Sequence, residues 1–167
     1  MIRTILDFEH IWSRELESTQ KLFKHIPDRA LAQQADPQGR TLGRLAWHIT
    51  ICIAETMEST GLKSTGPGKQ DSVPSSSKEI FSKYSDAAIS LLEQVKKNWT
   101  DGTLEEVIET YGRKWTRGFA LMALVHHQIH HRGQMTVLMR QAGLEVPGLF
   151  GPARQEWAAF GKQPPVI

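Results

Sequence analysis

The chain has 167 residues, a length that suits a single domain spanning residues 1–167 with its own hydrophobic core. Apolar residues make up 40% and charged residues 23% of it, as is usual for soluble globular proteins. The formal net charge of +2 is too small to indicate a surface that binds phosphates, so we expect no nucleic-acid partner.

The cellular setting is constrained by one cysteine and by the absence of long apolar runs. Cys52 is the only cysteine, which excludes an internal disulfide and fits a reducing compartment. The first ten residues carry Asp7 and Glu9 and lack the apolar core of a signal peptide. No run of about 18 apolar residues occurs, so we expect a cytoplasmic protein without a membrane span.

Four segments repeat apolar residues at the spacing of an amphipathic helix. These expected helices span residues 4–25, 41–61, 76–99 and 116–141. Stop signals follow three of them, namely Pro27, Gly61 and Gly143. Ser76 and Glu79 have the spacing of a capping box at the start of the third helix.

The segments between the helices are less regular. Residues 62–77 form a long Gly-, Pro- and Ser-rich connection, and residues 103–115 fit either a short helix or an extended excursion. A short helix is expected near residues 153–160. With no convincing strand alternation, the sequence predicts an all-α four-helix bundle with a long loop between helices 2 and 3 and a short C-terminal helix.

Four of the seven histidines lie in "HHQIHH", residues 126–131 of the last long helix. At 100° per residue, His127 and His131 share one stripe, which we predict to face the bundle interior. The same stripe carries Ala120, Ala123, Leu124, Gln134 and Leu138. His126 and His130 form a second pair on the flank of the helix. The far side, predicted to face outward, carries Arg132, Thr136 and Arg140.

Two histidines four residues apart can bind one divalent metal from one helix, and a third ligand would then come from another helix. His48 is a candidate because it shares an apolar stripe of the second helix with Leu45 and Ile51. Spacing alone leaves a metal site and ordinary buried or surface histidines equally open. Cys52 fits either a ligand or a small buried hydrophobe, and Glu55 fits a ligand, a base or a solvated charge.

Two known metal motifs are excluded by the residues around these histidines. In "HQIHH", Gln128 stands where the zinc-protease motif H-E-x-x-H has its catalytic Glu, and an amide cannot take a proton from water. The Glu-x-x-His motif of di-iron bundles is absent at every histidine.

Three stretches, "TLGRLAWHI", "HHQIHHRGQMTVLMRQAG" and "VPGLFGP", together resemble the DinB/YfiT-like superfamily. The resemblance implies a four-helix bundle whose metal is held by three histidines, which fall on His48, His127 and His131. It leaves His126 and His130 without a ligand role. Gln134, one turn beyond His131, is placed to orient that ring by a hydrogen bond.

Three protein ligands leave coordination positions open, as in catalytic metal sites. The resemblance implies a divalent metal, zinc or nickel, that activates a thiol or water for transfer or hydrolysis on a small substrate. The expected partners are this substrate and a low-molecular-weight thiol. The alternative is a non-enzymatic, stress-related bundle that binds a metal or a small ligand.

We also expect a homodimer, chiefly because members of this family often dimerise through helix faces. Val125 and Ile129 lie near the predicted outward arc of the last helix. Apolar residues exposed there would indicate a partner surface, whereas packing beneath a loop or the C-terminal tail would explain them without one.

Overall fold

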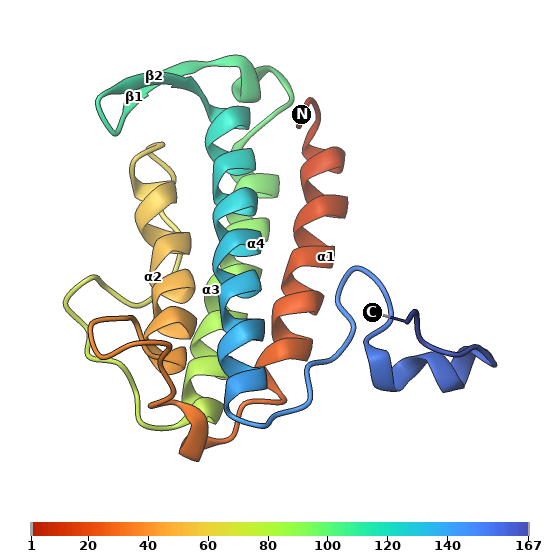
Figure 1. The fold of residues 1–167 in the computed structure, drawn as a ribbon. Helices are drawn as coiled ribbons and strands as arrows, with labels where there is room; N and C mark the ends of the chain where they lie inside the picture. The colour runs from red at the N-terminus through yellow and green to blue at the C-terminus, as the bar shows by residue number, and fades with distance from the viewer. Residues whose placement is uncertain (1, 167) are drawn as a thin grey trace.

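The computed structural model of the protein describes residues 2–166. Its long helices are α1 (Ile5–Phe23), α2 (Leu42–Glu58), α3 (Ser77–Asn98) and α4 (Arg117–Gln141). The shorter elements are the 3₁₀ helices η1 (Asp28–Ala30), η2 (Gly102–Glu105) and η3 (Arg154–Phe160) and the strands β1 (Val107–Thr110) and β2 (Arg113–Thr116) (Figure 1). The prediction of an all-α four-helix bundle is confirmed, and a small β-hairpin is added to it.

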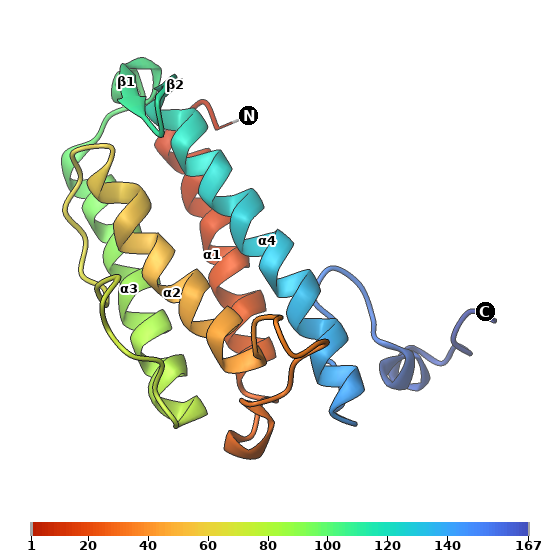
Figure 2. The same ribbon diagram turned by 60° about the vertical axis from the view of Figure 1, so that its left-hand side comes forward.

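The long loop between α2 and α3 sets the direction of the helices. Figures 1 and 2 show that α1 and α4 run one way along the bundle while α2 and α3 run the other way. Residues 59–76 therefore return along the whole length of α2, which is roughly 25 Å at 1.5 Å per residue. The length of this connection allows two consecutive helices to lie parallel, because an extended chain covers about 3.3 Å per residue.

Every long helix begins at a hydroxyl side chain that accepts a hydrogen bond from a backbone N–H of the first turn. These caps are Thr4, Thr41, Ser76 and Thr116. Ser76 accepts from the backbone N of Glu79, which confirms the expected start of α3. Gly61 and Gly143 follow α2 and α4 with φ of 79° and 70°, the left-handed conformation expected at a helix stop.

The ambiguous segment before α4 is extended. β1 and β2 pair antiparallel, with Val107 opposite Thr116 and Thr110 opposite Arg113. The two residues between the strands, Tyr111 and Gly112, have φ of 50° and 68°, as in a type I′ hairpin turn. The hairpin lies at the end of the bundle where α2 finishes and α4 begins (Figure 1).

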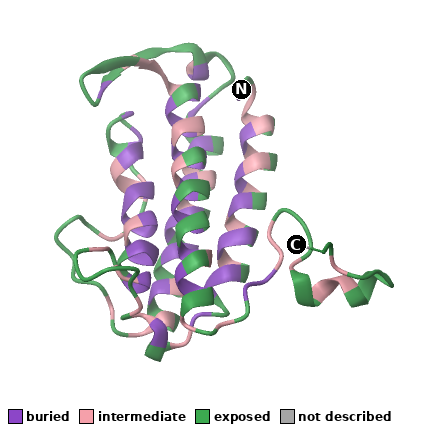
Figure 3. Ribbon diagram, in the orientation of Figure 1, coloured by how far each residue is buried: buried purple, intermediate pink, exposed green. Residues whose placement is uncertain are grey.

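Buried and exposed residues alternate with the helical repeat along α1, α3 and α4, whereas most of α2 is buried (Figure 3). The largest fully buried apolar side chains include Phe8, Trp12, Leu22, Ile49, Ile53, Tyr84 and Leu121. The indole N–H of Trp12 donates to the carbonyl of Ala88 at 2.9 Å, which satisfies the polar atom of a buried ring and ties α1 to α3. Among residues 2–166, no helix combines the length and the apolar character needed to cross a bilayer.

The prediction that Arg132 faces outward is wrong. Its side chain is only 2% exposed and lies 2.7 Å from the carboxylate of Glu15 on α1, itself 3% exposed. Arg132 also donates to the hydroxyl of Thr19 at 2.9 Å. Because α1 covers this side of α4 at Arg132, that side chain is interior, and a buried cation is tolerated there since an anion and a hydroxyl meet it. Arg140, on the same side of α4, is exposed as predicted.

The expected apolar patch on α4 is also reduced by packing. Val125 is buried in the core, whereas Ile129 is 38% exposed. Of the two residues expected on this surface only Ile129 is exposed, although Phe119 and Val137 of the same helix are exposed as well. The homodimer therefore remains a prediction that rests on the resemblance alone.

The expected C-terminal helix is confirmed as η3, which is of the 3₁₀ type. Figure 1 shows η3 beside the bundle rather than within it, and none of its residues is buried. Lys21 of α1 holds this segment through the carbonyl of Gly148 at 2.8 Å and the carboxylate of Glu156 at 3.3 Å.

Candidate metal centre

Three imidazoles from two helices point their Nε2 atoms at one another. The Nε2 of His127 lies 3.2 Å from that of His48 on α2 and 3.1 Å from that of His131, one turn along α4. The possible ligand atoms of these three residues all lie within 4.8 Å of one another. The structure thus brings together the three histidines that the sequence singled out, in an arrangement that could hold a metal ion.

The separations of these nitrogens fit a shared metal. Two imidazole nitrogens bound at about 2.05 Å to one ion would lie about 3.3 Å apart at tetrahedral angles and about 2.9 Å apart at right angles. The distances of 3.1 and 3.2 Å lie between these values. No large movement of α2 against α4 would be needed to bind an ion.

The three imidazoles have too few protons facing one another to satisfy every Nε2 atom by hydrogen bonds, which favours a bound cation at this position. The Nδ1 of His131 lies 2.7 Å from Oε1 of Gln134, an atom that can only accept. The proton of His131 is therefore on Nδ1, and its Nε2 presents a lone pair to the cluster. The Nε2 of His127 carries at most one proton, which can be donated to His48 or to His131 but not to both. A metal would satisfy all three lone pairs at once.

Burial keeps the imidazoles in the neutral form that binds metals. It lowers the pKa of His48 to about 4, and the positive charge of Arg40 acts in the same direction. Burial also lowers the pKa of His127 to about 4, with a further contribution from His131. The pKa of His131 is lowered by burial too, against the opposing effect of its bond to Gln134. Metal ligation by His requires this neutral form.

The remaining candidates lie around the cluster rather than in it. Among the residues that the structure describes, the converging ligand atoms include no cysteine or carboxylate. The Sγ of Cys52 lies 3.6 Å from Nδ1 of His48, and burial raises the pKa of this thiol to about 11. Glu55 pairs with Lys69 at 2.7 Å. His126 and His130, which the sequence placed on the flank of the helix, are both exposed.

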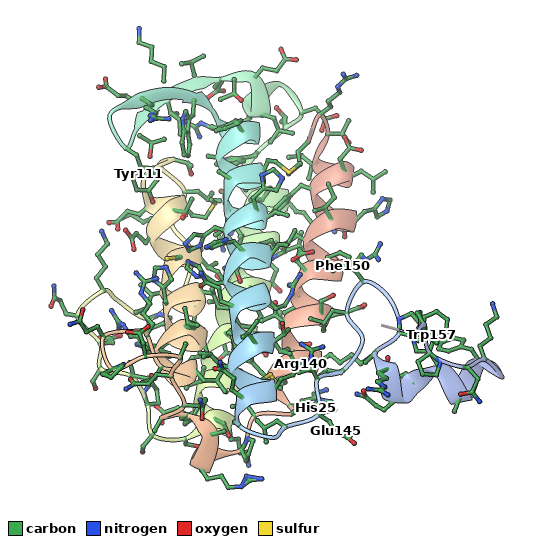
Figure 4. All side chains as sticks on the ribbon, viewed as in Figure 1. His25, Tyr111, Arg140, Glu145, Phe150 and Trp157 are labelled. Atoms are coloured by element: carbon green, nitrogen blue, oxygen red, sulfur yellow. The ribbon has the colours of Figure 1, made fainter. Side chains whose placement is uncertain are left out.

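Two cavities open on different sides of the three histidines. One, of about 340 Å³, is lined by His48, His127 and Cys52 and by two aromatic residues near the hairpin, Tyr111 and Trp115. Figure 4 shows Tyr111 at the hairpin turn, above the C-terminal end of α2. This cavity offers an apolar, aromatic wall to a molecule that approaches the metal position.

The second cavity, of about 530 Å³, lies on the side of His131. Its wall includes Gln134 and His130 from α4 and Arg40 from the loop before α2, together with apolar side chains of both helices. The three-histidine cluster is thus approached from an aromatic side and from a side that carries a guanidinium.

Sequence reasoning missed Arg40, Tyr111 and Trp115, which lie outside the helix stripes that it compared. Arg40 directly precedes the capping residue Thr41, which lies two helical turns before His48. This position was the only sequence signal that Arg40 lies near the site. Gln128, which has no role at the site, is fully buried and donates to the carbonyl of Ile49 at 2.8 Å, so it joins α4 to α2.

Comparison with known proteins agrees with this architecture. The model of the DinB family matches residues 1–165. YrdA of Bacillus subtilis strain 168, described as an uncharacterized protein, is 44% identical over 165 residues, which is 99% of each chain. The crystal structure of a DinB-like protein from Bacillus cereus is also 44% identical, with a TM-score of 0.86 over 90% of this chain and 100% of the other.

A more distant relative shares the fold alone. YjoA, a DinB-like protein of Bacillus subtilis, has a crystal structure that matches with a TM-score of 0.65 at 21% identity, over 84% of this chain and 96% of its own.

Proposed function

The chain belongs to the DinB family, and from this premise we propose that it is a metal-dependent enzyme whose ligands are His48, His127 and His131. The metal would be a divalent ion that imidazole favours, zinc or nickel. The reaction would be transfer or hydrolysis on a small substrate, with a low-molecular-weight thiol or water as the attacking group. The observation that carries the proposal is the convergence of three Nε2 atoms at spacings that suit one ion.

The surroundings of the histidines support an open, reactive site rather than a closed structural one. Structural zinc is usually enclosed by four protein ligands, whereas catalytic zinc has three and an exchangeable position. The cluster consists of three histidines, and cavities adjoin it on two sides. When bound there, the metal would lower the pKa of a coordinated thiol or water and so supply a nucleophile near neutral pH.

The protein's own residues would prepare this chemistry in three ways. Gln134 holds His131 in the tautomer whose Nε2 can bind a metal. The burial that lowers the pKa of His48 and His127 keeps both rings neutral in the working range of pH. Trp115, against the rings of Tyr111 and Phe119, forms an aromatic wall that would exclude water from one side of a bound substrate.

Metal content of untagged protein tests the ligand assignment. We expect about one zinc or nickel ion per chain in the wild type and its loss in His127→Ala. The matched control is His126→Ala, which removes the neighbouring, exposed imidazole and should keep the metal. Equal metal content in the two variants would refute the assignment, and wild-type protein that takes up neither ion on reloading would refute the metal site.

A second candidate function is a non-enzymatic protein that stores or senses a metal, and the position of Cys52 favours it. The sulfur lies 3.7 Å from Nε2 of His48, close to the roughly 3.5 Å expected between a sulfur and a nitrogen on one tetrahedral zinc. A rotation of this side chain would close the site. Cobalt-loaded protein whose spectrum contains a thiolate band that Cys52→Ser removes would support this function over the enzyme.

A further inference from the structure

Arg40 lies at the wall of the cavity that adjoins His131, and its charge is unmatched. Among residues 2–166, no carboxylate forms an ion pair with it. The acid on the same wall is Asp36, which accepts a hydrogen bond from the backbone N of Gln38 at 2.9 Å within its own turn. The guanidinium is thus free to meet a ligand.

Arg40 is exposed to solvent, and its guanidinium adds positive charge beside the proposed metal site. Three neutral imidazoles bring no negative charge to a divalent ion, so the bound site would carry +2 before Arg40 is counted. Arg40 and His131 line the same cavity, so the cation of Arg40 lies on the His131 side of the proposed metal site. By itself it would oppose metal binding, because like charges repel at this range. A bound anion would remove this repulsion.

We propose that Arg40 binds a carboxylate of the substrate or co-substrate whose other end reaches the open position of the metal. This inference rests on the metal site proposed above. The planar guanidinium can meet the two oxygens of a carboxylate with parallel hydrogen bonds. A ligand with one carboxylate is sufficient to pair with the single guanidinium on this wall. Leu45, Val137 and Leu138 would pack on its apolar stem.

The test compares two thiols that differ only at the far end. Cobalt-loaded protein is titrated with 3-mercaptopropionate and with 3-mercapto-1-propanol, and binding is followed by the thiolate-to-cobalt absorption band. We expect the carboxylate thiol to bind wild-type protein about ten-fold more tightly, as is usual for one charge-assisted contact. In Arg40→Gln this preference should fall below about two-fold, and cobalt should bind at least as tightly as in the wild type.

Arg44→Gln is the matched control, because Arg44 is an exposed arginine one turn further on that does not line the cavity. It should keep the ten-fold preference. Equal binding of the two thiols by wild-type protein, or a preference that survives in Arg40→Gln or is lost in Arg44→Gln, would overturn the role of Arg40. Failure of cobalt to bind the wild type at all would instead overturn the metal site, so the two proposals fail in distinguishable ways.

Discussion

The Oε1 of Gln134 lies 2.7 Å from the Nδ1 of His131, and this contact determines which nitrogen of His131 carries the proton. The amide is held from its other end, since its Nε2 lies 3.2 Å from the Nε2 of His130. His130, which is exposed and has no proposed ligand role, thus orients Gln134, and Gln134 in turn orients the proposed ligand His131. Such supporting contacts commonly change metal affinity by 10- to 100-fold.

Replacement of Gln134 by Ala should weaken metal binding about ten-fold without unfolding the protein, because His131 then loses the acceptor that fixes its tautomer. Competition with a chromophoric chelator measures the affinity. Gln134→Glu should restore or strengthen binding, since a carboxylate is the better acceptor for Nδ1–H. Gln141→Ala, an exposed change near the end of the same helix, is the control. An unchanged affinity in Gln134→Ala would show that packing alone fixes the ring.

The stability of the metal-free protein should depend on pH through His48 and His127. Their pKa values are about 4 in the folded chain and about 6.5 when unfolded, so the unfolded chain binds more protons between these values. The free energy of unfolding should therefore fall as the pH falls from about 6.5 to about 4, and these groups should have little effect above about pH 7.

Urea unfolding of the metal-free protein at several pH values in this window measures the effect. The double variant His48→Gln, His127→Gln should show a smaller loss of stability on acidification. His126→Gln, which alters an exposed imidazole on the same helix, should behave as the wild type. The same slope in all three proteins would mean that other groups cause the acid sensitivity.

The ion pair between Glu15 and Arg132 should be costly to break from one side. Arg132→Met leaves a buried carboxylate without its partner and should lower the free energy of unfolding by about 3–5 kcal/mol. The double variant Glu15→Gln, Arg132→Met should recover much of that loss. Arg140→Met, two turns further along α4 and exposed, should change stability by no more than about 0.5 kcal/mol. Urea denaturation compares them, and similar losses in both single variants would contradict a buried pair.

Tyr111 occupies a backbone conformation that a tyrosine rarely adopts, with φ of 50° at the first position of the hairpin turn. Asn is the residue preferred there, so Tyr111→Asn should stabilise the protein by up to about 1 kcal/mol while removing a ring from the aromatic cavity. Tyr111→Phe keeps both the strain and the ring and is the control. Thermal unfolding checks the direction, and a lower midpoint for Tyr111→Asn would show that the contact with Trp115 outweighs the strain.

The four helices and much of the metal site could be predicted from the sequence, because both depend on local rules. Helical periodicity and capping residues gave helices that end within about three residues of the observed bounds. The 3.6-residue turn placed His127 and His131 on one stripe and His126 and His130 beside it, as the structure confirms. The resemblance to the DinB/YfiT-like superfamily supplied His48, whose stripe alone did not distinguish a ligand from a core residue.

Tertiary packing decided what local periodicity could not. A helical stripe shows which residues share a direction, but it does not show how many neighbouring helices cover them. Because α1 packs against α4, Arg132, which was expected to face outward, is buried in an ion pair with Glu15. Arg40 lies in an irregular loop, and the cavity that it shares with His131 exists only when that loop packs beside α4. Helix geometry therefore brings His127 and His131 together, whereas contacts between segments far apart in the chain place the guanidinium of Arg40 beside them.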